Sequence, residues 1–132
     1  MTTREKIEQA LDTLPTLTAY GVGIFEHGRG LSMQEAQKEV AKKKDILLSD
    51  TADFEKICTW LEAIQKTPTI NPNYTSYDLK HIAERQVGYA TNGTFIAAAI
   101  YSGFAFETAV GSPNVAFGMS EKSLKMKQLL SR

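Results

Sequence analysis

The stretch Thr91-Asn92-Gly93-Thr94-Phe95-Ile96-Ala97-Ala98-Ala99-Ile100-Tyr101-Ser102 decides the fold. Thr91 is a cap-forming residue, and a helix over 92–102 would be apolar on nearly every side. A helix without a polar face has to be surrounded by protein, so we expect this one to lie at the centre of the core. Gly103 follows at the position where a left-handed backbone ends many helices.

Capping residues and apolar spacing predict further helices on both sides of this one. Their expected ranges are 3–14, 34–44, 51–66, 77–86 and 121–130. A weak strand is expected over 17–25, and a hairpin is expected from 104–109 and 115–118, which flank the turn residues Gly111 to Asn114.

We therefore expect a mainly helical α+β fold with a small β-hairpin, and with a compact core built from the helices at 51–66, 77–86 and 92–102. The chain of 132 residues suits a single domain, 1–132. Within it, residues 1–50 would be an N-terminal segment that packs on, or extends from, a helical core at 51–132. The element order from residue 51 onward is that of a winged helix-turn-helix.

Composition restricts the cellular setting. Cys58 is the only cysteine, so no intramolecular disulfide can form, and a reducing compartment is expected. The N-terminus lacks the apolar run of a signal peptide, and no apolar stretch approaches the ~20 residues of a membrane span. We expect a cytoplasmic protein that does not bind a membrane.

The charge balance bears on the partner. Lys and Arg total 15, as do Asp and Glu, so the net charge is zero. Because phosphate neutralisation supplies most of the affinity for nucleic acid, a neutral chain makes a protein partner the better expectation. Nucleic acid is the alternative partner. No zinc, nucleotide or phosphate-loop motif is present, so no metal and no cofactor are expected.

One polar cluster carries candidate chemistry. Lys80, His81 and Glu84 crowd one region of the helix at 77–86, and His81 can touch Glu84 at i, i+3. A His–carboxylate pair can act as a general base or supply two metal ligands, but the other histidine, His27, lies in a distant loop. The alternative is a solvent-facing charged stripe without a function of its own. Cys58 falls on an apolar stripe and is expected to be buried and inert.

The winged-helix interpretation depends on the helix at 92–102 reading DNA. That helix offers Asn92, Thr94 and Ser102 but no Lys or Arg. Phosphate contacts would come from Lys80, His81 and Arg85, or from the C-terminal helix. The alternative is that the helices and the hairpin simply form a compact α+β unit.

Three short patterns between residues 69 and 119 resemble a known group of proteins. They are Ser76-Tyr77-Asp78-Leu79-Lys80-His81, then Asn92-Gly93 with the alanine-rich helix, and then Pro113-Asn114. The chain resembles short, uncharacterised bacterial proteins that are carried by phages, plasmids and other mobile elements. The resemblance implies a context but no catalytic residue. It makes six positions the first to mutate: Tyr77, Lys80, His81, Glu84, Asn92 and Asn114.

Three functions follow from these observations. The first is an accessory protein of bacteria or of a mobile element that inhibits or modulates a host protein, such as one of a defence system. The second is a winged-helix DNA-binding regulator. The third is a small enzyme that uses Lys80, His81 and Glu84. We expect a binding protein rather than an enzyme, with a binding surface that includes Tyr77, Lys80, His81, Arg85, Asn92 and Asn114. Neither the identity of the partner nor the oligomeric state follows from the sequence.

Overall fold

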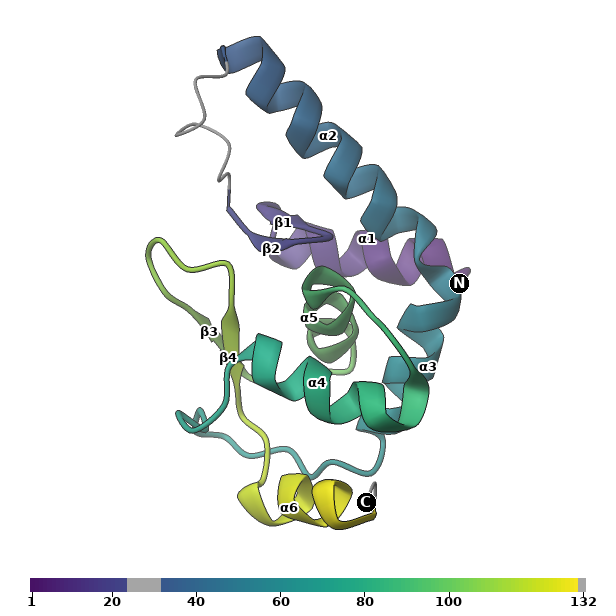
Figure 1. Ribbon diagram of the computed structural model, residues 1–132, viewed down its shortest axis with the longest axis vertical. Coiled ribbons are helices and arrows are strands. Elements are labelled where there is room, and N and C mark those ends of the chain that lie inside the picture. Colours follow the sequence, from purple (N-terminus) through teal and green to yellow (C-terminus); the bar gives the residue numbers. More distant parts are fainter. Residues whose placement is uncertain (24–31, 131–132) are drawn as a thin grey trace.

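Helix α5 (Asn92–Tyr101) lies in the middle of the computed structural model, which describes residues 1–23 and 32–130 (Figure 1). Every residue from Gly93 to Ala99 is buried, so the predicted burial on all sides is confirmed. Thr91 caps the helix by accepting a hydrogen bond from the Thr94 N–H. The chain leaves the helix at Gly103, whose φ of 91° is the left-handed conformation predicted for it.

Three helices pack against α5: α1 (Thr3–Thr13), α3 (Thr51–Leu61) and α4 (Ser76–Val87). Small residues on α5 allow the surrounding backbone to come close. A Cβ atom added at Gly93 would lie 1.9 Å from the carbonyl oxygen of Thr18. Glycine is therefore required where α5 meets the segment that follows α1.

Aromatic and aliphatic side chains form one buried cluster around α5. The ring of Phe95 meets Trp60 and Phe117 edge to face, with centroids 6.4 and 6.2 Å apart. Five residues from the first fifty belong to the same cluster: Ile7, Ala10, Leu17, Ala19 and Leu47. These five residues of the N-terminal segment thus pack on the core.

Two short antiparallel strand pairs complete the described part of the fold. β1 (Leu17–Thr18) pairs with β2 (Gly21–Val22), and β3 (Phe106–Thr108) pairs with β4 (Val115–Phe117). The mainly helical α+β class with a small hairpin is confirmed. The first strand was expected to reach residue 25, but residues 24 and 25 lie outside the described residues, as does His27.

Helix α2 (Met33–Ser49) is longer than predicted. We expected it to end near Lys44, with its lysines in the last turn, but the helix continues for five more residues and its last turn contains no basic residue. Leu47 explains the extension, because it is completely buried against the core and needs the helix to bring it there.

Helix α3 is shorter than predicted, ending at Leu61 and not at residue 66. The chain tightens there, because the N–H of Ile64 bonds the carbonyl of Leu61 at 3.0 Å. This turn tucks Ile64 into the core and lets Lys66 form a bridge with Met119. Burial of Ile64 and pairing of Lys66 are contacts between distant segments, which helical spacing does not report.

The order α3, α4, α5, β3–β4 and α6 (Glu121–Leu130) matches the predicted winged-helix order. Its third helix cannot act as a recognition helix, because such a helix must present side chains to a groove and α5 is enclosed. Thr94, which the winged-helix alternative would require to face DNA, is completely buried and donates a hydrogen bond to Asp50 at 3.0 Å. This part of the chain therefore has the element order of a winged helix, but it lacks the exposed third helix that such a module uses to contact DNA.

Candidate functional site

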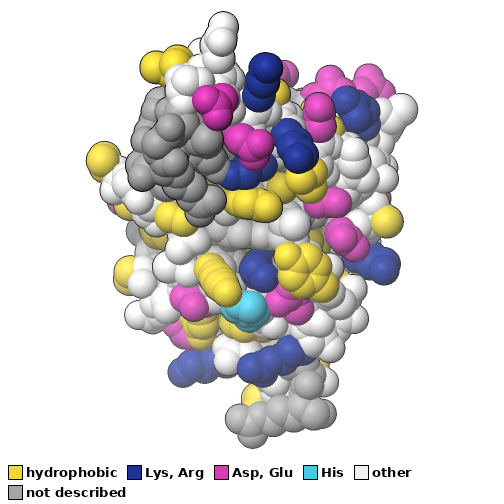
Figure 2. Space-filling model, turned by 45° about the horizontal axis from the view of Figure 1, so that its top comes forward, with side chains coloured by type: hydrophobic (Ala, Val, Ile, Leu, Met, Phe, Trp, Pro, Cys, Tyr) yellow, Lys and Arg dark blue, Asp and Glu magenta, His cyan; other side chains and the backbone are white. Residues whose placement is uncertain are grey.

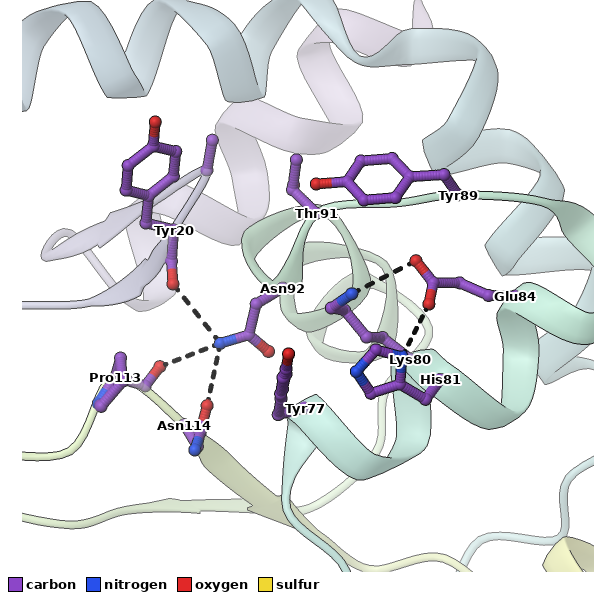
Figure 3. Close-up of a pocket in the computed structure, with 11 residues that line it drawn as sticks. Tyr20, Tyr77, Lys80, His81, Glu84, Tyr89, Thr91, Asn92, Pro113 and Asn114 are labelled. Atoms are coloured by element: carbon purple, nitrogen blue, oxygen red, sulfur yellow. Dashed lines mark hydrogen bonds and ion pairs between the residues drawn. The ribbon is translucent and has the colours of Figure 1, made fainter.

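A cleft of about 550 Å³ opens where α4, the start of α5, the β1–β2 turn and the β3–β4 loop meet (Figure 3). Six of the seven predicted site residues line it: Tyr77, Lys80, His81, Glu84, Asn92 and Asn114. The seventh, Arg85, is exposed on α4 and does not line the cleft. The other lining residues are Ala19, Tyr20, Tyr89, Thr91 and Pro113.

Hydrogen bonds between segments hold these parts together. The N–H of Gly93 bonds the carbonyl of Ala19 at 3.0 Å, and the N–H of Val22 bonds the carbonyl of Pro113 at 2.9 Å. Buried Ser76, at the start of α4, accepts a hydrogen bond from the first residue of β4. These hydrogen bonds bring the cleft residues together, although they are far apart in the sequence.

Local sequence aligns the α4 residues on one face. Thr75 and Asp78 form a capping box that begins the helix. Lys80, His81 and Glu84 then lie on neighbouring turns, because residues three and four apart share a face. The opposite face of α4 is buried.

Glu84 is the centre of the polar cluster. Its carboxylate lies 3.2 Å from Nζ of Lys80 and 2.9 Å from Nδ1 of His81, and it accepts the N–H of Ala90 at 3.0 Å. Burial acts to raise the pKa of Glu84. The hydrogen bonds from the backbone of Ala90 and from the side chains of Lys80 and His81, together with the charge of Lys80, have the larger effect and hold that pKa below its usual value. Glu84 therefore stays ionised and joins α4 to the loop that precedes α5.

Three exposed tyrosines surround the cleft, and each holds a lysine ammonium over its ring. Nζ of Lys80 lies 5.1 Å from the ring centroid of Tyr77 and 5.3 Å from that of Tyr89. Nζ of Lys43 lies 4.5 Å from that of Tyr20. Figure 2 shows hydrophobic side chains around a shallow hollow on this face, with a histidine, a basic and an acidic side chain between them.

Asn92 joins three segments. Its Nδ2 donates to Oδ1 of Asn114 at 3.0 Å and lies 3.4 and 3.5 Å from the carbonyl oxygens of Pro113 and Tyr20. Its Oδ1 is buried and has no hydrogen-bond partner within residues 1–23 and 32–130. Figure 3 shows the amide nitrogen of Asn92, and not this oxygen, turned toward the three acceptors. An unpaired buried oxygen is costly, so it marks a position where a ligand's donor would be stabilising.

The other candidates do not form a second reactive centre. Cys58 is partly buried in α3, and burial raises the pKa of its thiol to about 11, which supports the prediction of an inert cysteine. Across the described ranges, no group of three or more His, Cys, Asp or Glu side chains could hold a metal ion. Nor does any helix in that part of the chain have the length and apolar character to cross a membrane.

The sequence analysis named neither Tyr20 nor Tyr89 as a site residue. Tyr20 lies between two very short strands, and nothing in its neighbourhood points to residues 77–92 or 113–114. Exposure of a large aromatic side chain is the signal that identifies both residues, because 60% of Tyr20 and 74% of Tyr89 is accessible to solvent. That signal exists only in the folded molecule.

Comparisons of the chain with protein-family models, with curated proteins and with solved structures find no match.

Proposed function

We propose that the protein is an accessory factor of bacteria or of a mobile genetic element, and that it acts by binding a host protein through this cleft. Inhibition or modulation of the bound protein would be the outcome, with components of a host defence system among the candidate targets. The expected location is the cytoplasm. The proposal depends on the character of the cleft and on the resemblance at residues 76–81, 92–99 and 113–114.

A single observation supports it most strongly: Tyr20, Tyr77 and Tyr89 come from separate parts of the chain yet gather around one cleft with their rings exposed. Exposed aromatic side chains add nothing to the core and are enriched in protein interfaces, where they bury a large area at low entropic cost. The polar residues beneath them are mostly engaged with one another. On this reading the tyrosines make the contacts and the polar cluster keeps the floor rigid.

A pull-down from bacterial lysate tests the proposal, read by mass spectrometry with and without nuclease. The bait is the wild-type protein beside the double variant Tyr77→Ser/Tyr89→Ser. The matched control is Met126→Ser/Leu129→Ser, which removes two exposed hydrophobic side chains from α6. We expect a nuclease-resistant partner that the control retains and the tyrosine variant loses at least tenfold.

Two outcomes would contradict the proposal. Equal capture by the tyrosine variant would place the interface elsewhere. Loss of every partner on nuclease treatment would favour the nucleic-acid alternative. Melting temperatures of all three proteins, measured beside the pull-down, ensure that lost binding does not reflect unfolding.

The convergence of Lys80, His81 and Glu84 in one cleft favours a second candidate function, general acid–base catalysis. His81 is oriented by Glu84, and 53% of its side chain is exposed, so its second ring nitrogen can face a substrate. If the protein modifies its partner, the captured partner will show a mass change that His81→Gln abolishes. An unchanged intact mass with wild-type protein would remove this candidate.

A further inference from the structure

We infer that the cleft binds a carboxylate side chain on an extended segment of the partner, with the ammonium of Lys80 as its anchor. This inference rests on the proposed function and adds the chemistry of the ligand. It follows from which charged groups are already paired and which donors and acceptors remain.

The charges already present in the cleft disfavour a cationic ligand. Exposed tyrosine rings beside a carboxylate would normally attract a cation. Here Lys80 already occupies that position, since its Nζ lies over Tyr77 and Tyr89 and pairs with Glu84. A second cation would meet the ammonium and find the carboxylate bound by three donors.

An anion finds donors in the same place. A lysine ammonium has three N–H groups, and the hydrogen bond from Lys80 to Glu84 uses one of them. The side chain of Lys80 is 9% exposed, so the donor is shielded from competing water, which strengthens a charge-assisted hydrogen bond. His81 adjoins this position, since it contacts the same Glu84 carboxylate.

The small number of charges favours one carboxylate over a chain of phosphates. Lys80 and Glu84 are the charged side chains that line the cleft beside His81, and their charges cancel. Binding of nucleic acid requires several cations along a track, because affinity grows with each phosphate that is neutralised. A single carboxylate needs only the local donors.

The unpaired Oδ1 of Asn92 fits the main chain of such a segment, because a peptide N–H is the donor that it lacks. This oxygen is covered in the structure, so a ligand reaches it only after a neighbouring side chain moves. Tyr77 lines the same cleft as Asn92, and 44% of its surface is exposed, which makes it the candidate for this movement. We therefore expect Tyr77 to move when the segment binds.

Titration with three capped peptides, Gly-Ser-Xaa-Ser-Gly with Glu, Gln or Lys at the centre, tests the inference by NMR. The readouts are the side-chain amide of Asn92 and the rings of Tyr77 and Tyr89. We expect millimolar binding of the Glu peptide, about tenfold tighter than the isosteric Gln peptide, and no binding of the Lys peptide. Equal affinity for Glu and Gln, or preference for Lys, would overturn the inference.

The variant Lys80→Gln/Glu84→Gln removes both buried charges together, so that neither is left unpaired. This double variant should no longer bind the Glu peptide more tightly than the Gln peptide. The control variant Arg85→Gln, which changes a residue outside the cleft, should still prefer the Glu peptide. If the double variant fails to fold, Tyr89→Ser provides the test, because it removes a cleft wall and should weaken the Glu peptide several-fold. Full affinity in either folded variant would contradict the assigned site.

An oligothymidine probe separates the other anionic class. Tighter binding of this probe than of the Glu peptide, with loss of the peptide signals on competition, would overturn the inference in favour of nucleic acid. If a partner is captured in a tyrosine-dependent way but the Glu peptide does not release it, the inference is wrong and the proposed function is still supported. If the cleft binds the Glu peptide selectively but no tyrosine-dependent partner is captured, the inference is supported and the proposed function is contradicted.

Discussion

The two faces of α4 differ in what their side chains do. One face buries Leu79, Ile82 and Ala83 in the core around α5. The other carries Tyr77 and His81 into a cleft where their surfaces remain largely exposed. Burial of apolar area is the main source of stability, whereas exposed aromatic rings contribute little to it. If the cleft binds a partner as proposed, stability and recognition depend on opposite sides of one helix, and substitutions should separate them.

The largest effect is expected on the core side. Phe95→Ala removes a completely buried ring between Trp60 and Phe117, so the free energy of unfolding should fall by ~3–5 kcal/mol. Urea denaturation followed by circular dichroism measures this loss. The control is Tyr89→Ala on the cleft side, which should change stability by no more than about 0.5 kcal/mol. Similar losses in both variants would break the division.

The next effect concerns the point where core and cleft meet. Gly93→Ala would normally stabilise a helix by about 1 kcal/mol. Here the added Cβ would lie 1.9 Å from a backbone oxygen, so we expect a loss of ~1–3 kcal/mol in the same denaturation experiment. The sign of the change in the free energy of unfolding decides the test. A stabilised variant would mean that α5 and the segment at residues 18–19 are not in close contact.

The smallest expected change in stability concerns the polar cluster of Lys80, His81 and Glu84, and it depends on pH. Because the pKa of Glu84 is lowered in the folded protein, its stabilising contribution is complete above the unfolded pKa of about 4.3 and disappears as the pH falls through the lower folded value. Glu84→Gln should therefore cost ~1–2 kcal/mol at neutral pH, and the difference from wild type should shrink in acid.

Denaturation at a series of pH values measures this difference. Glu8→Gln is the matched control, since Glu8 makes an exposed contact with Arg4 at 3.6 Å. It should alter stability by no more than about 0.5 kcal/mol at any pH. A constant difference between wild type and Glu84→Gln down to strong acid would show that the carboxylate's charge does not stabilise the fold.

Much of the fold was predictable because its signals are local. Three of the predicted helices begin at capping boxes, with Thr2, Ser32 and Thr75 as the N-caps, and a cap and its partner lie within three residues of each other. The burial of α5 followed from composition alone, because no arrangement of that stretch offers a polar face. Helix ends were predicted less well where a distant contact, such as that of Leu47 or Ile64, decided them.

The candidate site was predictable in part for the same reason. Lys80, His81 and Glu84 share one helical face at fixed spacing, so their contact is a local consequence of the helix. Asn92 and Asn114 were singled out by resemblance, and the structure shows why they belong together, with the amide of one donating to the other. Arg85 was included on charge alone, and its position on α4 turns it away from the cleft.

Short-range patterns thus determined the helices, the class of the fold and the polar cluster on α4. The tertiary structure alone decided that these residues line a cleft, and that Tyr20 and Pro113 complete it. The physical reason is that the cleft exists through bonds between distant segments, such as those from Gly93 to Ala19 and from Val22 to Pro113. A contact of this kind depends on how whole elements pack around α5, and no local pattern of residues encodes it.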